Sequence, residues 1–139
     1  MKTAKELLQA YIDGNALESA ALFAEHGALE LPYLSDLGVE PRYQGPTNIG
    51  SFLNFLHEQM YPGFRFVDVR IYIDKPDQAY GEYTIDHKSG ISGKVVHQRF
   101  FGHCTVANGK IILLREALNV FAAADAMFPG GIADVIGRK

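Results

Sequence analysis

Three residues in the last third of the chain have side chains that can move protons or hold negative charge: Arg99, His103 and Glu116. A glutamate can act as a general acid or base when its pKa lies near the working pH. A histidine can relay a proton near neutral pH, and an arginine can bind a carboxylate through two parallel hydrogen bonds. Whether the three residues act together depends on how the strands that carry them are paired.

The pairing follows from Asn108-Gly109, which is a strong signal for a two-residue hairpin turn. With that turn, Phe101 faces Glu116, and Arg99 and His103 lie diagonally on either side of the glutamate. Diagonal neighbours on two strands are roughly 7–8 Å apart, within reach of long side chains. A three-residue turn would move Glu116 to the face opposite Arg99, so this catalytic group depends on the register.

Both faces of the predicted hairpin are substantially apolar, so neither is expected to be fully exposed to water. The face of Glu116 mixes large apolar groups with a few polar ones, which is typical of ligand pockets. Burial would raise the pKa of the Glu116 carboxyl, and a nearby Arg99 would lower it. Helices on one face and a second subunit on the other would cover both faces, so we predict a homodimer. Cys104 falls on the face opposite Glu116 and is expected to serve packing.

Each catalytic candidate also has a purely structural interpretation. Glu116 and Arg99 can form a buried ion pair that only supports the fold. Arg99 can equally neutralise Glu82, and His103 can be a packing or surface group. His103 cannot share a metal ion with His97, because six residues along a strand span roughly 20 Å. We therefore predict no metal site.

The candidate substrate-binding residues come from several parts of the chain. His57 can reach the mouth of a pocket or end a helix at the surface. Glu82 can be a second pocket carboxylate or a solvated one, and Tyr33 can hydrogen-bond a ligand or form part of the wall. The predicted set is Leu31, Tyr33, His57, Glu82, Phe101 and Leu118.

Length and composition limit the classes of protein that fit. The 139 residues suit one domain over 1–139, with 122–139 as a tail or arm, and 47% of them are hydrophobic. A net charge of −3 without a basic run gives no footprint for nucleic acid or for a membrane surface. No apolar run approaches the roughly 18 residues of a membrane helix. The single cysteine excludes an intrachain disulfide and a cysteine-based zinc site, and it suits a cytoplasmic location.

Hydrophobic periodicity predicts helices in the first half of the chain and strands in the second. Helices first and a meandering sheet second indicate an α+β fold. We expect a strongly curved antiparallel sheet with the helices on its concave side, which leaves a natural pocket. The expected helices cover 4–12, 15–26 and 46–60, the expected strands cover 28–31, 66–73, 78–87, 94–107 and 110–121, and a surface loop covers 33–46.

Five segments carry a family resemblance: Tyr11–Asn15, Leu22–Ala28, Tyr43–Pro46, Asn108–Ile111 and Arg115–Phe121. Together they resemble the SnoaL-like branch of the nuclear transport factor 2-like superfamily, over roughly residues 4 to 121. The last segment resembles the end of phenazine-biosynthesis proteins of the PhzA/PhzB type. The resemblance implies a dimeric, cone-shaped α+β fold around a pocket, usually without a metal or an organic cofactor.

The same resemblance implies roles for particular residues. In PhzA/PhzB-type proteins a glutamate in the matching Arg-Glu motif is the acid/base group, which implies this role for Glu116. Their histidine on the third helix corresponds to about Leu53, and His57 lies one turn later. The base and the strand aspartate of ketosteroid isomerases fall on Leu31 and Phe101, so that reaction is not expected here.

We therefore expect a small-molecule-binding protein that performs acid/base chemistry without a cofactor. The reaction would be an isomerisation, cyclisation, dehydration or condensation of a small, partly apolar metabolite. Glu116 would move the proton, and His103 or Arg99 would stabilise developing negative charge. The alternatives are a non-catalytic ligand-binding protein and a structural dimerisation domain whose cone is filled by side chains such as Phe101 and Leu118.

Overall fold

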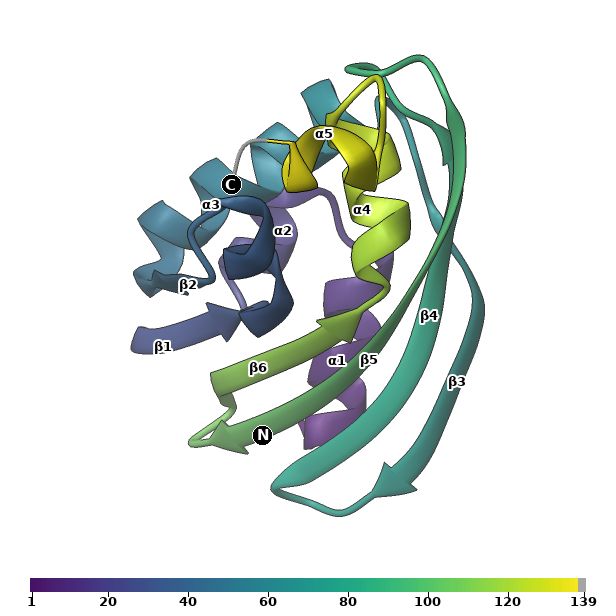
Figure 1. The fold of residues 1–139 in the computed structure, drawn as a ribbon. Helices are drawn as coiled ribbons and strands as arrows, with labels where there is room; N and C mark the ends of the chain where they lie inside the picture. Colours follow the sequence, from purple (N-terminus) through teal and green to yellow (C-terminus); the bar gives the residue numbers. More distant parts are fainter. Residues whose placement is uncertain (138–139) are drawn as a thin grey trace.

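The computed structural model describes residues 1–137, which form one six-stranded sheet with the helices in its hollow (Figure 1). The strand order is β2-β1-β6-β5-β4-β3. The strands are β1 (Phe23–Glu30), β2 (Arg42–Gln44), β3 (Phe66–Asp74), β4 (Gln78–Lys88), β5 (Val95–Ala107) and β6 (Lys110–Leu118). The helical elements are α1 (Ala4–Asp13), α2 (Ala16–Ala20), η1 (Pro32–Leu37), α3 (Gly45–Phe55), η2 (Leu56–Met60), α4 (Val120–Met127) and α5 (Ile132–Ile136).

The sheet is curved and does not close into a barrel, and this confirms the predicted α+β cone. Strands β3 to β6 pair antiparallel in sequence order, whereas β1 pairs parallel to β6. Helix α1 contacts β3, β4, β5 and β6 and buries Leu7, Leu8 and Tyr11 against them. Its start is fixed by the expected capping box, in which Thr3 and Glu6 hydrogen-bond to each other's backbone.

The second helix is shorter than predicted, because α2 ends at Ala20 and the strand β1 begins at Phe23. The alanines and leucine after residue 20 are as compatible with a helix as with a strand, and the parallel pairing with β6 decides between them. Gly27 permits this pairing, because a Cβ at that position would lie 2.5 Å from the carbonyl oxygen of Ile111.

The segment expected to be a surface loop contains two short elements, the 3-10 helix η1 and the edge strand β2. The third predicted helix is present as α3 and continues into a π-helical turn, η2. Among residues 1–137, no helix is long and apolar enough to cross a membrane.

The C-terminal helices pack against the open part of the cone. Helix α4 contacts β5 and η1, and Asn119 caps its first turn. The Gln98 amide donates to the Asn119 carbonyl and accepts from the Asn119 amide, both at 2.8 Å. At the other end of α4, the Ser89 hydroxyl donates to the Ala126 carbonyl at 2.5 Å. The β4–β5 turn and β5 therefore hold α4 at both ends.

Candidate functional site

The β5–β6 hairpin begins as predicted and then changes register. Asn108 and Gly109 both have positive φ, 53° and 74°, as a two-residue hairpin turn requires. Ala107 pairs with Lys110. Between the pairs Val106–Ile111 and Thr105–Leu113, one residue of β6 is left over. This extra residue, Ile112, makes a β-bulge and shifts the rest of β6 by one position.

The bulge places Glu116 opposite Gly102 rather than Phe101. Glu116 therefore points to the inner face of the sheet, whereas Arg99 and His103 point to the outer face. The predicted arrangement of Arg99 and His103 on either side of Glu116 is wrong for this reason. The predicted separation of Cys104 from Glu116 is also wrong, because both lie on the buried inner face.

Glu116 is the buried carboxyl of the cone, with 2% of its surface exposed. The Tyr83 hydroxyl donates a hydrogen bond to its Oε2 atom. Burial raises the pKa of Glu116 from 4.5 to about 7, and the Tyr83 hydrogen bond opposes part of that rise. Tyr11 lies close enough that the negative charge of Glu116, added to burial, raises the pKa of its phenol. Among residues 1–137, the carboxyl thus sits among tyrosines with no cation beside it.

The Tyr83 ring is packed firmly on the inner face. It stacks on Phe100 with 5.9 Å between ring centroids, and it meets the edge of Phe66 at 5.0 Å. Tyr83 was not predicted from the sequence, which pointed to the adjacent Glu82 as the site residue of that strand. Gly102 carried a signal for it, because a glycine inside a strand often marks a close approach of another group.

A small apolar cavity lies beside Phe100, the residue on which Tyr83 stacks. Leu31 and Leu118, two of the predicted substrate-binding residues, line it together with Phe100. Leu118 follows Glu116 by two residues on β6, so both side chains point inward. The cavity has a volume of about 30 Å³, which is roughly the share of one water molecule in the liquid. The polar groups in its lining are the amide of Gln98 and the phenol of Tyr61.

The outer face carries most of the other predicted site residues. Tyr33, Tyr80, Phe101 and His103 line a shallow hollow of about 350 Å³ there. Glu116 also borders this hollow, although its carboxyl accepts the hydrogen bond from Tyr83 on the inner face. The predicted binding residues Tyr33 and Phe101 are therefore separated from the inner carboxyl by the sheet itself.

Several polar and charged groups of the outer face contact one another. Glu82 accepts a hydrogen bond from the Tyr72 hydroxyl, and its Oε2 lies 3.5 Å from Nε of Arg99. His103 Nε2 lies 2.9 Å from Oε1 of Gln78. These contacts agree with the structural interpretation of Arg99, which neutralises Glu82 and not Glu116.

His57 lies in a third place, a polar hollow of about 390 Å³ at the end of α1. Asp13, Glu18 and Arg65 line the same hollow. The His57 ring packs 4.5 Å from that of Phe64, and partial burial lowers its pKa. The structure therefore does not bring His57 to Glu116.

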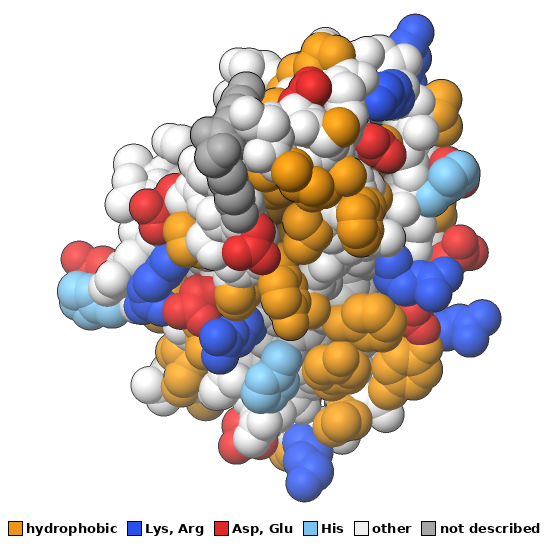
Figure 2. Space-filling view, in the orientation of Figure 1, with side chains coloured by type: hydrophobic (Ala, Val, Ile, Leu, Met, Phe, Trp, Pro, Cys, Tyr) orange, Lys and Arg blue, Asp and Glu red, His pale blue; other side chains and the backbone are white. Residues whose placement is uncertain are grey.

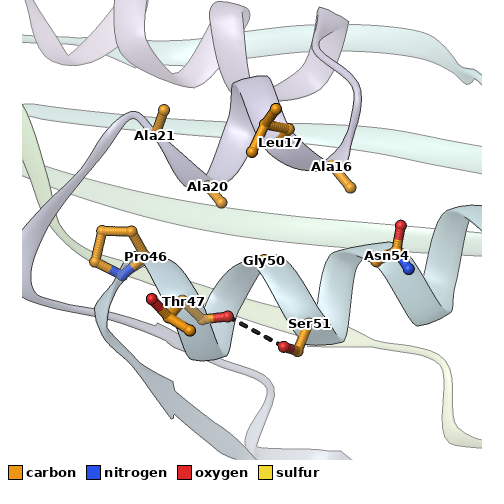
Figure 3. A pocket seen from close by; sticks show the side chains of 9 residues that line it. All are labelled: Ala16, Leu17, Ala20, Ala21, Pro46, Thr47, Gly50, Ser51 and Asn54. Carbon is orange, nitrogen blue, oxygen red and sulfur yellow. Dashed lines mark hydrogen bonds between the residues drawn. The ribbon is translucent and has the colours of Figure 1, made fainter.

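A further hollow is a groove of about 510 Å³ between α2 and α3 (Figure 3). Small residues such as Ala20 and Gly50 line it, and the Ser51 hydroxyl turns back to the Thr47 carbonyl of its own helix. The residues of 1–137 that line it include no titratable side chain, so its chemistry is poorer than that around Glu116. Within residues 1–137, no group of three or more His, Cys, Asp or Glu side chains is placed to hold a metal ion.

Comparison with known proteins identifies the family. No protein-family model matches the chain. An uncharacterized PhzA/B-like protein of Pseudomonas aeruginosa is 30% identical over 121 residues, which span 86% of this chain and 82% of that protein. The chain belongs to the PhzA/B-like proteins. The predicted resemblance is thereby confirmed.

Solved structures support the fold of this PhzA/B-like protein. The phenazine biosynthesis-related protein PhzB2 of Pseudomonas aeruginosa superposes with a TM-score of 0.74 at 21% identity, over 89% of this chain and 84% of that one. An NTF2-like protein of Burkholderia thailandensis gives 0.72 at 19% identity, over 93% and 100%. A SnoaL-like protein of Jannaschia sp. CCS1 gives 0.72 at 16% identity, over 89% and 90%.

Proposed function

We propose that this PhzA/B-like protein binds a small, partly apolar metabolite inside its cone and moves a proton on it with Glu116, without a cofactor. The reaction class is isomerisation, cyclisation, dehydration or condensation. The observation that carries the proposal is a fully buried carboxyl whose hydrogen-bond donor is a tyrosine and which has no cation of residues 1–137 beside it. Solved structures of this fold include candidate polyketide cyclases, and the reaction class is consistent with that.

The environment of Glu116 suits proton transfer in both directions. A group with a pKa of about 7 is present in both protonation states near neutral pH, so it can donate and accept. An apolar surrounding strengthens electrostatic interactions with charge that develops on a ligand. Leu31, Phe100 and Leu118 line the neighbouring cavity, in which Phe100 is the residue that stacks on Tyr83.

Ligand binding requires the inner cavity to widen, because about 30 Å³ holds no metabolite. Ala123 and Met127 of α4 form one wall of the cavity, and methionine repacks more easily than branched side chains. We propose that the ligand enters on the α4 side and reaches Glu116 past Leu118.

The test is exchange of carbon-bound protons with solvent. The protein is mixed with a panel of small cyclic and aromatic ketones in D2O, and deuterium uptake next to the carbonyl is followed by NMR. We expect the wild type to take up deuterium on at least one ketone. With Glu116→Gln the rate of uptake should fall by about 100-fold or more. Equal rates in the two proteins would exclude Glu116 as the acid/base group.

The small cavity favours a second candidate, a non-catalytic domain whose cone is filled by its own side chains. Binding of the same ketones, followed by amide chemical shifts around Phe100 and Leu118, separates the possibilities. Binding without exchange in the wild type indicates a ligand-binding protein. Neither binding nor exchange across the panel indicates the structural domain.

We also propose that a second copy of the chain covers the outer face of the sheet. Figure 2 shows apolar side chains gathered over the strands in this view, and among residues of the outer face Phe101 is 37% and Tyr72 54% exposed. We expect Phe101→Arg to convert a dimer into a 15.3 kDa monomer in sedimentation. Leu17→Arg, at an exposed apolar residue on α2, is the control that should leave the dimer intact.

A buried, free Cys104 agrees with the proposed cytoplasmic location.

A further inference from the structure

The contact between Tyr83 and Glu116 crosses an entire strand. Tyr83 belongs to β4 and Glu116 to β6, and β5 lies between these two strands. On β5, Phe100 pairs with Tyr83 and Gly102 pairs with Glu116. The phenol therefore extends diagonally over Gly102 to reach the carboxyl on the far strand.

Gly102 is what leaves this path open. A Cβ at that position would lie 2.2 Å from the Tyr83 hydroxyl and 3.0 Å from the ring carbon that carries it. Any other residue would push the phenol away from Glu116. The chain thus has its smallest residue at the one place where the hydroxyl must pass.

The Tyr83 ring has little freedom to choose another partner. It is fully buried, and it is held by the Phe100 stack on one side and the Phe66 edge contact on another. Among residues 1–137, its hydroxyl is the one hydrogen-bond donor to the Glu116 carboxyl. If either partner were removed, a buried polar group would be left unpaired.

We propose that Tyr83 is the positioning residue of the Glu116 site: its hydroxyl passes over Gly102, fixes the orientation of the carboxyl by binding Oε2, and leaves Oε1 for the ligand. This inference rests on the proposed function of Glu116. A tyrosine hydroxyl bound in this way also favours the ionised carboxylate. The Tyr83 hydrogen bond thereby lowers the pKa of Glu116, which burial alone would raise further and so keep the carboxyl protonated.

The experiment is a pH titration of the Glu116 side-chain carboxyl by carbon-13 NMR in the wild type and in Tyr83→Phe. Phenylalanine keeps the ring stacking and removes only the hydroxyl. We expect the pKa of Glu116 to rise by about one in Tyr83→Phe, since one hydrogen bond to an ionised group has roughly that effect. Gly102→Ala retains the hydroxyl but displaces it, so it should raise the pKa in the same direction.

Tyr72→Phe is the matched control. The Tyr72 hydroxyl also donates to a glutamate, Glu82, but on the outer face of the sheet and away from Glu116. Its removal should leave the titration of Glu116 unchanged. A Glu116 titration that is the same in Tyr83→Phe and in the wild type would overturn the proposal, even if Glu116→Gln abolishes proton exchange.

Deuterium exchange on a ketone gives the second readout. In Tyr83→Phe we expect the pH midpoint of exchange to move upward together with the NMR titration, and the rate at its plateau to fall about tenfold as the carboxyl loses its orientation. If the titration moves while Glu116→Gln exchanges as fast as the wild type, the proposed function fails and Tyr83 is only a structural partner. The two failures are therefore distinguishable.

Discussion

The two faces of the central sheet carry one tyrosine–glutamate pair each, and the pairs differ in what surrounds them. On the inner face Tyr83 donates to Glu116, and both are buried. On the outer face Tyr72 donates to Glu82, but there Arg99 lies 3.5 Å from the same carboxyl and extends into solvent. The same hydrogen bond therefore occurs in two electrostatic settings. The exposed Arg99 beside Glu82 makes the outer pair an ordinary surface ion pair, whereas burial makes Glu116 a candidate acid.

The largest expected effect tests how tightly the inner pair is packed. Gly102→Ala should lower the free energy of unfolding by about 4 kcal/mol, because the methyl group overpacks the core and breaks a buried hydrogen bond. His103→Ala, one residue along on the exposed outer face, should change it by less than about 0.5 kcal/mol. Urea denaturation of both variants measures the difference. Similar costs for the two would show that the inner pair is not tightly packed.

The next effect concerns pH. Glu116 has a higher pKa in the folded protein, about 7, than its usual 4.5, so the folded state binds the proton more tightly. Its contribution favours folding at low pH and is lost as the pH rises from about 4.5 through about 7. The loss amounts to about 3 kcal/mol. The wild type should lose this stability between pH 4 and pH 8, whereas Glu116→Gln should not. The free energy of unfolding of Glu116→Gln minus that of the wild type should therefore rise by that amount over this range. A constant difference would mean that the carboxyl is solvated.

The smallest effect belongs to the outer pair. Arg99→Ala should lower the free energy of unfolding by less than about 1 kcal/mol, because the guanidinium is largely exposed and water screens its attraction to Glu82. Raising the salt concentration to 1 M should remove most of that difference. A cost as large as that of Gly102→Ala would contradict the contrast between the faces.

Much of the fold could be predicted, because its signals are local. The capping box of Thr3 and Glu6 marked the first helix, and Asn108-Gly109 marked the last hairpin. The alternation of apolar residues along β3, β4 and β5 agreed with the strands that formed. The second helix was overextended, since β1 is stabilised by pairing with β6, some ninety residues away in sequence.

The site could be predicted in part. Glu116 was singled out, and the structure buries it in the cone. The predicted partners of Glu116, Arg99 and His103, were wrong. Ile112 forms a bulge that the turn sequence does not predict, and this one extra residue moves each later side chain of β6 to the opposite face of the sheet. The bulge lies in the part of β6 that pairs with β1 as well as with β5. Pairing with a strand that is distant in sequence leaves no local signal. Tyr83 was missed because its role depends on a glycine on one strand and a glutamate on another.

The attachment of α4 has a consequence for how the chain tolerates shortening. A chain that ended at Leu118 would retain all six strands, but Ala123 and Met127 would no longer cover Leu31, Phe100 and Leu118. These side chains would form an open apolar patch, the kind of surface through which proteins aggregate. The C-terminal helices therefore protect the protein from aggregation by covering apolar side chains of the cone.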